Sequence, residues 1–337
     1  MRAKRRLLTG LGVAAPVLVA LLLLGPRVEI EMRLHTPTLP ADLDAYLAAA
    51  EAGYGDVAPG TEKAIVWAGE RGRRSGWAVV YLHGFSASRQ ETAPLAERVA
   101  AGLEANLYYA RLTGHGRGGP AMLEASVDAW LNDGLEALAI GRRLGQRVVL
   151  IGVSTGATLA SWLATRAEAA TALAALVLIS PNFAPADRAA ELLTWPWGAW
   201  LAERVIGPEY HWQPHNEAHG RYWTTRYPAR ALLPMMGLVK LTRESPLEAI
   251  RAPLLLVYSS EDRLVSVDAM MEAYVRFGSV PKRLAPFEGS QDPDHHVLAG
   301  RILSPTTTEP LAGLILEFLA ERPVDSGETA AGESGRP

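Results

Sequence analysis

One segment, residues 148–164 with the sequence VVLIGVSTGATLASWLA, constrains the fold more than any other. A run of aliphatic and β-branched residues ends in Gly-Val-Ser-Thr-Gly, and a helical pattern begins directly afterwards. Gly152 and Gly156 leave room for the backbone in a tight strand-to-helix turn, so Ser154 is expected in a strained conformation at the helix N-terminus. The segment therefore predicts a buried strand, a sharp turn and a helix, with the Ser154 hydroxyl projecting from the end of a sheet.

The rest of the chain alternates between apolar strands and helical segments. Residues 91–105 place Leu95, Val99 and Leu103 on one side of a helix, and Ser126 suits the N-cap of a helix that ends before Gly145. Aliphatic strands that alternate with helices indicate a largely parallel sheet covered on both faces. Further strands are expected at residues 63–69, 76–85, 106–112, 175–180, 253–259 and 282–287.

The alternation stops between residues 185 and 246. This segment predicts an inserted helical cap, or else a second packed layer without a substrate role, and it holds five of the nine tryptophans: Trp195, Trp197, Trp200, Trp212 and Trp223. The expected organisation is a signal anchor or signal peptide at 1–26, a connecting segment at 27–62, a core at 63–184 and 247–322, the cap at 185–246, and a disordered tail at 323–337.

The residues that follow each strand are the candidates for chemistry, because ligands of open parallel sheets bind at the carboxyl ends of the strands. Serine at its free pKa is a weak nucleophile that needs a base, and the base needs an orienting acid. For a strand-turn-helix serine the chain order is Ser, then Asp or Glu, then His. After the strand at 253–259, Asp262 is the favoured acid, Glu261 is its rival, and Asp268 is expected to be a surface or cap residue.

The base is expected after the last strand, in the loop QDPDHH. Adjacent side chains generally point apart, so only one of His295 and His296 can serve, and His296 is favoured because it directly precedes the apolar run VLAG. A tetrahedral intermediate also needs donors for its oxyanion. The backbone N–H groups of Thr155 and Phe85 are expected to supply them, whereas His83 is expected to be structural.

With these residues together, the sequence resembles the α/β-hydrolase superfamily over about residues 64–320. The motifs that carry the resemblance are LHGF at Leu82, TGHG at Thr113, GVSTG at Gly152, SSEDRLV at Ser259 and HHV at His295, in that order. More narrowly, the chain looks like the branch that contains carboxylesterases, monoacylglycerol lipases and lysophospholipases. The family's histidine-valine pairing supports His296, although the double histidine departs from the family pattern.

The resemblance implies cleavage of a carboxylic ester through an acyl-enzyme on Ser154, with His296 and Asp262 completing a triad and a cap selecting the substrate. It implies no metal and no cofactor, and the expected partner is a lipid-like, acylglycerol or lysophospholipid type of ester with an apolar acyl group. Acyl transfer to another alcohol stays open, because it uses the same triad. A serine aminopeptidase of the same fold is the alternative enzyme, which would need an acidic cap site for a substrate amine, with Glu203, Glu209 and Glu217 as candidates. An inactive, membrane-tethered binding module is the alternative outside enzymes.

Residues 7–24 carry no charge and follow four cations in MRAKRR. Eighteen helical residues span about 27 Å, close to the ~30 Å hydrocarbon core of a bilayer. An uncleaved N-terminal helix is expected to anchor the chain, with the catalytic domain on the non-cytoplasmic (periplasmic or extracellular) side. Secretion after signal cleavage is the alternative. This apolar N-terminus is absent from many soluble members of the superfamily.

Composition excludes several other classes of site. The chain has no cysteine, which removes thiolate catalysis and Cys-ligated zinc, and its net charge of -3 gives no basis for nucleic-acid binding. Residues 114–119 satisfy G-x-G-x-x-G, but Pro120 and the distance to the next helix argue against a dinucleotide site. His211, His215 and His219 recur every four residues, but Pro214 interrupts the helix that would align them on a metal.

Overall fold

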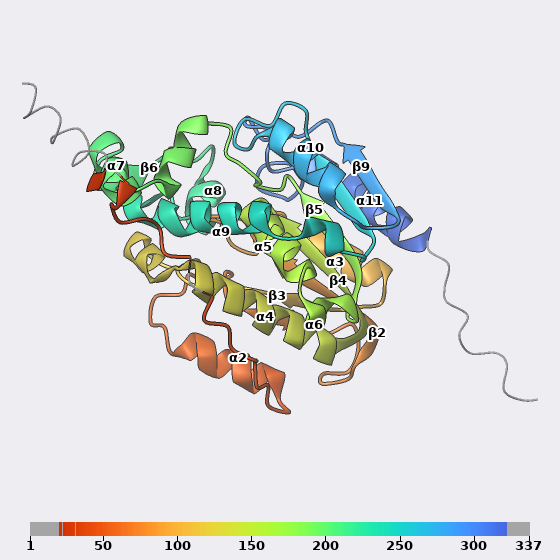
Figure 1. Ribbon diagram of the computed structural model, residues 1–337. Coiled ribbons are helices and arrows are strands. Elements are labelled where there is room, and N and C mark those ends of the chain that lie inside the picture. The colour runs from red at the N-terminus through yellow and green to blue at the C-terminus, as the bar shows by residue number, and fades with distance from the viewer. Residues whose placement is uncertain (1–19, 22, 31, 322–337) are drawn as a thin grey trace, which may run out of the picture.

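A computed structural model of the chain describes residues 20, 21, 23–30 and 32–321. Its centre is a seven-stranded sheet in the order β1-β3-β2-β4-β5-β8-β9, parallel throughout except that β1 runs antiparallel to β3 (Figure 1). The sheet predicted from the alternating pattern is confirmed. Its strands are β1 (Ala64–Val66), β2 (Ser75–Leu82), β3 (Asn106–Tyr109), β4 (Gly145–Val153), β5 (Leu173–Ile179), β8 (Leu254–Tyr258) and β9 (Lys282–Pro286).

Helices cover both faces of this sheet. Outside the segment between β5 and β8, the α-helices are α2 (Leu43–Ala52), α3 (Leu95–Gly102), α4 (Val127–Leu144), α5 (Thr155–Ala164), α6 (Ala167–Ala170), α10 (Val267–Arg276) and α11 (Thr308–Ala320). Short 3-10 helices lie at η1 (Gly119–Glu124) and η5 (Pro305–Thr307).

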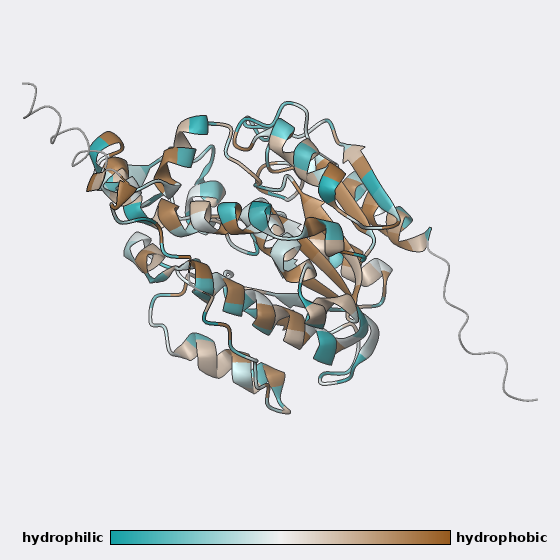
Figure 2. Ribbon diagram, in the orientation of Figure 1, coloured by the Kyte–Doolittle hydropathy of each residue, from teal (hydrophilic) through white to brown (hydrophobic). Residues whose placement is uncertain are grey.

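The alternation of side chains along β4 separates two hydrophobic cores. Val148 and Leu150 pack in the core formed with α4, α5 and α10, whereas Val149 and Ile151 pack in the core formed with α3 and α11. Both faces of the strand are therefore buried, which is why its sequence is a continuous aliphatic run rather than an alternating one. Figure 2 shows the central strands coloured largely as hydrophobic.

The expected cap of the fourth helix is confirmed. Ser126 is the N-cap of α4, and its hydroxyl accepts a hydrogen bond from the N–H of Ala129 at 3.2 Å. Gly145 follows Leu144 as predicted, but it has an extended conformation and begins β4 directly. Close packing explains the glycine, because a Cβ at this position would lie 2.4 Å from the backbone nitrogen of Ala78.

The segment between β5 and β8 departs from the regular alternation, as the sequence indicates. It contains η2 (Arg188–Thr194), α7 (Gly198–Val205), α8 (Glu217–Tyr222), η3 (Ala229–Ala231), α9 (Leu232–Glu244) and η4 (Leu247–Ala249). It also contains an antiparallel pair of strands that the sequence did not predict, β6 (Glu209–His211) and β7 (Arg226–Pro228). These strands are too short for a periodic pattern to be visible.

The predicted membrane anchor at residues 7–24 lies almost entirely outside the described residues, and so does the predicted disordered tail. Across the part of the chain that is described, no helix combines the length and the apolar character needed to cross a bilayer. The described start of the chain lies beside α7 (Figure 1), where the Trp197 Nε1–H donates to the carbonyl oxygen of Leu21 at 2.9 Å.

Candidate active site

The turn between β4 and α5 has the strained geometry that the glycine spacing predicts. Ser154 stands between the two elements with φ 51° and ψ -120°, a conformation that non-glycine residues rarely adopt. Its backbone N–H donates to the carbonyl oxygen of Ile179 at 2.9 Å, which ties the turn to the neighbouring strand β5. The surrounding structure thus holds this serine at the carboxyl end of the sheet.

Two glycines make this turn possible. A Cβ at Gly152 would lie 2.6 Å from the Cα of Ala157, and a Cβ at Gly156 would lie 2.2 Å from the carbonyl oxygen of Leu82. Backbone atoms cannot move aside as a flexible side chain can. Both positions therefore require glycine because of close approach, and α5 packs directly against the end of β2.

Asp262 and His296 come together after β8 and β9, respectively. The His296 Nδ1–H donates to Asp262 Oδ2 at 2.8 Å, and both side chains are almost fully buried. The other carboxylate oxygen, Oδ1, accepts from the N–H groups of Leu264 and Val265 at 2.9 and 3.0 Å. These bonds fix the carboxylate, and the carboxylate fixes the ring so that Nε2 is left as an acceptor.

The rival residues lie elsewhere. His295 Nδ1 and a carboxylate oxygen of Glu261 are 3.6 Å apart, and the Glu261 side chain is 72% exposed, so these two form a pair at the surface. Asp268 is an exposed residue in the first turn of α10. The structure brings Asp262 together with His296 and keeps the three rivals away from that pair.

Burial alone would lower the pKa of His296, because a buried imidazolium loses hydration. The charge and hydrogen bond of Asp262 outweigh this effect, with further contributions from the charges of Glu91 and Asp292, and the net result is a raised pKa. The site therefore stabilises an imidazolium at His296, which is the state that a base reaches when it takes a proton from a nucleophile.

Ser154 and His296 line one cavity of about 580 Å³. No hydrogen bond joins their side chains in the described structure, as is common in sites without substrate. Apolar side chains dominate much of the wall, with polar groups near His296. The apolar lining comes mainly from the segment between β5 and β8: Leu192, Leu193, Leu201, Ala202, Val205, Ile206, Leu232 and Met235.

The two expected oxyanion donors border this cavity. Thr155 is the first residue of α5, so its N–H has no acceptor within the helix. Phe85 lies in the loop after β2, and among the described residues its N–H makes no hydrogen bond. Both residues line the cavity beside Ser154.

Two buried histidines hold the Phe85 loop in place. The His83 Nδ1–H donates to the carbonyl oxygen of Gly84 at 2.8 Å, and His83 Nε2 accepts from the N–H of Leu112 at 3.1 Å. His115 Nε2 accepts from the N–H of Ser86 at 3.0 Å. Burial lowers the pKa of His83 to about 4 and that of His115 well below its usual range, so both rings are neutral. The structural role expected of His83 agrees with these bonds.

Sequence reasoning missed two buried carboxyl groups at the site. Asp292 Oδ2 accepts from the N–H groups of His296 and Val297 at 3.0 and 2.8 Å, and it shapes the loop that carries the base. Glu91 lies in the loop before α3, lines the cavity and is 2% exposed. The QDPDHH motif contained a signal for Asp292, whereas Glu91 lay in a segment interpreted only as an amphipathic helix.

The candidate amine-binding residues do not face the cavity. Glu203 forms an ion pair with Arg230, Glu209 forms one with Arg226, and Glu217 is an exposed residue in the first turn of α8. None of the three carboxylates lines the space beside Ser154.

One group of side chains near the cavity has ligand atoms that could hold a cation. The nearest atoms of His215, Asp292 and Asp294 lie within 4.8 Å of one another. His215 Nε2 lies 3.2 Å from Asp294 Oδ2, so a hydrogen bond between two loops accounts for this cluster. His211 lies on β6, His215 in the loop after it and His219 on α8, so the three histidines share no helix face.

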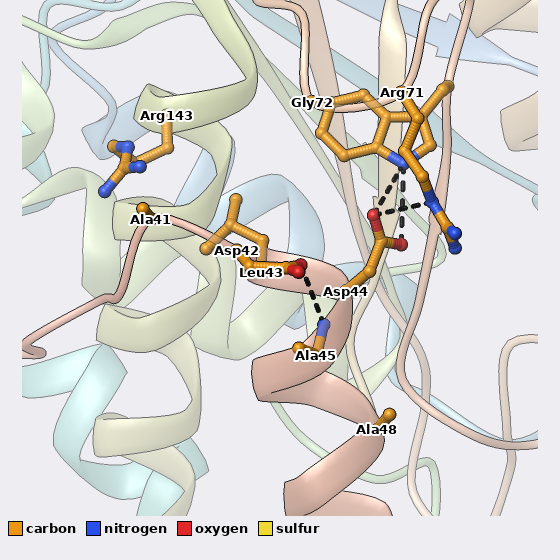
Figure 3. A pocket seen from close by; sticks show the side chains of 10 residues that line it. Ala41, Asp42, Leu43, Asp44, Ala45, Ala48, Arg71, Gly72 and Arg143 are labelled. Atoms are coloured by element: carbon orange, nitrogen blue, oxygen red, sulfur yellow. Dashed lines mark hydrogen bonds and ion pairs between the residues drawn. The ribbon is translucent and has the colours of Figure 1, made fainter.

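A second hollow of about 590 Å³ lies between the start of α2 and residues 67–72 (Figure 3). At its wall, Asp44 accepts a hydrogen bond from the Trp67 Nε1–H at 3.1 Å and pairs with Arg71 at 2.9 Å. Its lining contains neither a hydroxyl side chain nor a histidine. It therefore offers no nucleophile and no base of the kind found beside Ser154.

Comparison with known proteins places these features in context. Residues 73–291 match the protein family described as "Serine aminopeptidase, S33". No match is found among curated proteins.

Solved structures give likenesses over most of the chain. A structure of the metagenome-derived lipolytic enzymes LipS and LipT has a TM-score of 0.64 at 22% identity, covering 79% of this chain and 100% of that one. A monoacylglycerol lipase from Paleococcus ferrophilus has a TM-score of 0.56 at 18% identity, covering 76% and 97%. A soluble variant of monoglyceride lipase from Saccharomyces cerevisiae, bound to a substrate analogue, has a TM-score of 0.59 at 12% identity, covering 77% and 90%. At these identities the likeness shows a shared fold.

Proposed function

We propose that this chain, which belongs to the α/β-hydrolase family described as "Serine aminopeptidase, S33", is a serine hydrolase and that the bond it cleaves is a carboxylic ester. One observation carries the proposal: Asp262 and His296 are hydrogen-bonded at 2.8 Å at the cavity that Ser154 lines. An acid, a base and a strained serine at the carboxyl ends of parallel strands are the parts that acyl transfer needs.

The proposed reaction has two halves. His296 Nε2 takes the proton of Ser154 Oγ while that oxygen bonds to the ester carbonyl carbon, and the N–H groups of Phe85 and Thr155 donate to the oxyanion. The intermediate then expels the alkoxide, which His296 protonates, and the acyl group stays on Ser154. Water attacks the acyl-enzyme and gives a proton to His296, and the bond between the acyl carbon and Ser154 Oγ then breaks. His296 returns the proton to Ser154 Oγ, and the acid leaves. Asp262 keeps the ring oriented and stabilises the imidazolium in both halves.

The substrate we propose is a lipid-like ester with an apolar acyl group, of the acylglycerol or lysophospholipid type. The apolar lining of the cavity supports this choice, because an acyl chain that enters it leaves water. The solved structures that resemble this chain include lipolytic enzymes and monoacylglycerol lipases. An aminopeptidase would need a carboxylate for the substrate amine, and the three candidates Glu203, Glu209 and Glu217 are all outside the cavity lining. Asp187 and Asp294 do line the cavity, so the choice between ester and amine substrates is left to the comparison of the two substrate classes.

A series of p-nitrophenyl esters of increasing acyl length tests this proposal, with aminoacyl p-nitroanilides as the competing substrates. Each buried methylene contributes about 0.8 kcal/mol, so kcat/KM is expected to rise roughly fourfold per methylene until the cavity is filled. The anilides are expected to react far more slowly. Anilides cleaved faster than every ester would instead favour the aminopeptidase.

We further propose that the chain works at a membrane, with its catalytic domain on the non-cytoplasmic side. The uncharged run at residues 7–24 supports this, and so do large apolar side chains exposed around α7. Trp195 is 61% exposed, Trp200 54% and Val205 75%. Val205 also lines the cavity, so this exposed surface borders the route to Ser154.

The location is tested by fractionating cells that produce the full chain. The chain is expected in the membrane fraction after an alkaline carbonate wash, and external protease is expected to digest its catalytic domain in cells whose outer barrier has been opened. A chain recovered only from the soluble fraction, at its full length, would contradict both the anchor and the alternative of signal cleavage.

A further inference from the structure

The proposed mechanism leaves unused one buried ionisable group at the cavity. Glu91 is 2% exposed and lines the cavity together with Ser154 and His296. It lies in the segment between β2 and α3, four residues before that helix begins. A carboxyl group in such a place loses most of its hydration, so its retention calls for a compensating interaction.

The Glu91 carboxyl group contacts the loop that carries the oxyanion donor. Its Oε2 accepts from the N–H of Gly84 at 2.8 Å and from the Tyr81 hydroxyl at 3.4 Å. The Thr92 hydroxyl in turn donates to the Tyr81 hydroxyl at 2.8 Å. Gly84 directly precedes Phe85, an expected oxyanion donor that lines the cavity, so Glu91 is bonded to the backbone next to that donor.

The other oxygen, Glu91 Oε1, makes no hydrogen bond with any described residue. A point beside Gly84, where a side chain would place its Cβ, lies 2.6 Å from this oxygen and 3.1 Å from the Cβ of Ser154. The Glu91 carboxyl group and the Ser154 side chain thus both lie close to the same glycine.

Glu91 and His296 affect each other's pKa through their charges. Burial raises the pKa of Glu91 to about 7, the hydrogen bonds of Gly84 and Tyr81 and the charge of His296 act against this rise, and the charge of Asp292 adds to it. His296 is in turn faced by the charges of Asp262, Glu91 and Asp292. A neutral amide could accept from Gly84 equally well, so the hydrogen bond alone does not account for a carboxyl group.

We propose that Glu91 is a positioning residue for the hydrolysis: it holds the Gly84–Phe85 turn in place and stabilises the imidazolium of His296 by its charge. Glu91 touches no reacting atom and takes up no proton in the reaction. Above about pH 7, where Glu91 is mostly ionised, its charge acts when Ser154 has given its proton to His296, because a nearby carboxylate favours the charged ring. This inference rests on the proposed function only in requiring that Ser154 and His296 react together.

The test measures the second-order rate constant of labelling by a fluorophosphonate as a function of pH, for the wild type, Glu91→Gln and Glu309→Gln. The amide keeps an acceptor for Gly84 but removes the charge. The plateau labelling rate of Glu91→Gln is expected to be roughly tenfold lower than that of the wild type. The fall of the rate at low pH, the acid limb of the profile, is expected to move to lower pH, because the charge that favours protonated His296 is gone. Glu309→Gln removes a carboxylate at an exposed position on α11 and should match the wild type.

Two further variants keep the test decisive. Glu91→Ala removes both effects and is expected to lower the rate about 100-fold, as for loss of oxyanion support. Tyr81→Phe keeps the carboxyl group but removes a donor that favours its charged form, so it should shift the acid limb in the same direction by less. This variant serves if Glu91→Gln does not fold.

A Glu91→Gln profile that superimposes on the wild type would overturn the proposal, and so would a lower rate with an unmoved acid limb, which would mean a purely structural role. Labelling needs no natural substrate. If the wild type is labelled at Ser154 but hydrolyses no ester, the ester proposal fails while the comparison still decides the role of Glu91. If the folded wild type is not labelled, both fail.

Discussion

Replacing Ser154 with alanine is expected to lower kcat/KM for ester hydrolysis by on the order of 10⁴- to 10⁶-fold. The change removes one oxygen atom, that of the hydroxyl on the residue with positive φ between β4 and α5. The residual rate should come from the oxyanion donors and the cavity alone. Steady-state hydrolysis of the preferred p-nitrophenyl ester measures the loss.

The same variant must be shown to fold. Ser154 has a positive φ that alanine tolerates no better than serine, so a small change in the free energy of unfolding is expected. Denaturant unfolding followed by circular dichroism provides this control. A folded Ser154→Ala protein with wild-type hydrolysis would remove this serine from the mechanism.

The second large effect is expected at His296 and not at its neighbour. His296→Ala should lower kcat/KM by on the order of 10⁴- to 10⁶-fold, because Ser154 then lacks its base. His295→Ala should leave it within about twofold, as for a surface substitution, since His295 pairs with the exposed Glu261. The matched pair differs by one position in the chain, and hydrolysis of one ester by both variants gives the comparison.

The pH dependence should follow the same residue. The base works in its neutral form, so activity is lost as the pH falls through the pKa of His296, which Asp262 and the other nearby carboxylates raise above its ordinary value despite burial. The wild-type acid limb is therefore expected above the pKa of an ordinary histidine. A large loss of activity in His295→Ala, together with an active His296→Ala, would mean that His295 and not His296 is the base.

Short sequence patterns predicted those parts of the site in which a few adjacent residues set the backbone geometry. The Gly-Val-Ser-Thr-Gly turn follows from close approach, since a Cβ at Gly152 or Gly156 would collide with backbone atoms. Asp262 and His296 follow from chain order, because parallel strands bring their carboxyl ends to one edge of the sheet. The sequence favoured Asp262 over Glu261 and His296 over His295, and the two favoured residues are hydrogen-bonded to each other.

Contacts between distant segments could not be predicted in this way. Glu91 belongs to a segment in which the spacing of apolar residues predicts only the helix face that packs toward α11. That spacing does not indicate a hydrogen bond between Glu91 and Gly84. His115 was one residue of a TGHG motif, and its bond with Ser86 joins two loops 29 positions apart. The pairing of β6 with β7 likewise depends on packing within the segment between β5 and β8, where sequence periodicity is weak.

Labelling of the full wild-type chain with a fluorophosphonate, followed by mass spectrometry of its peptides, identifies the nucleophile directly. We expect one adduct, on Ser154, because this serine alone is expected to have a base and oxyanion donors in place. A folded chain that gains no adduct, or that carries the adduct on a different residue, would contradict the assignment of Ser154 as the nucleophile.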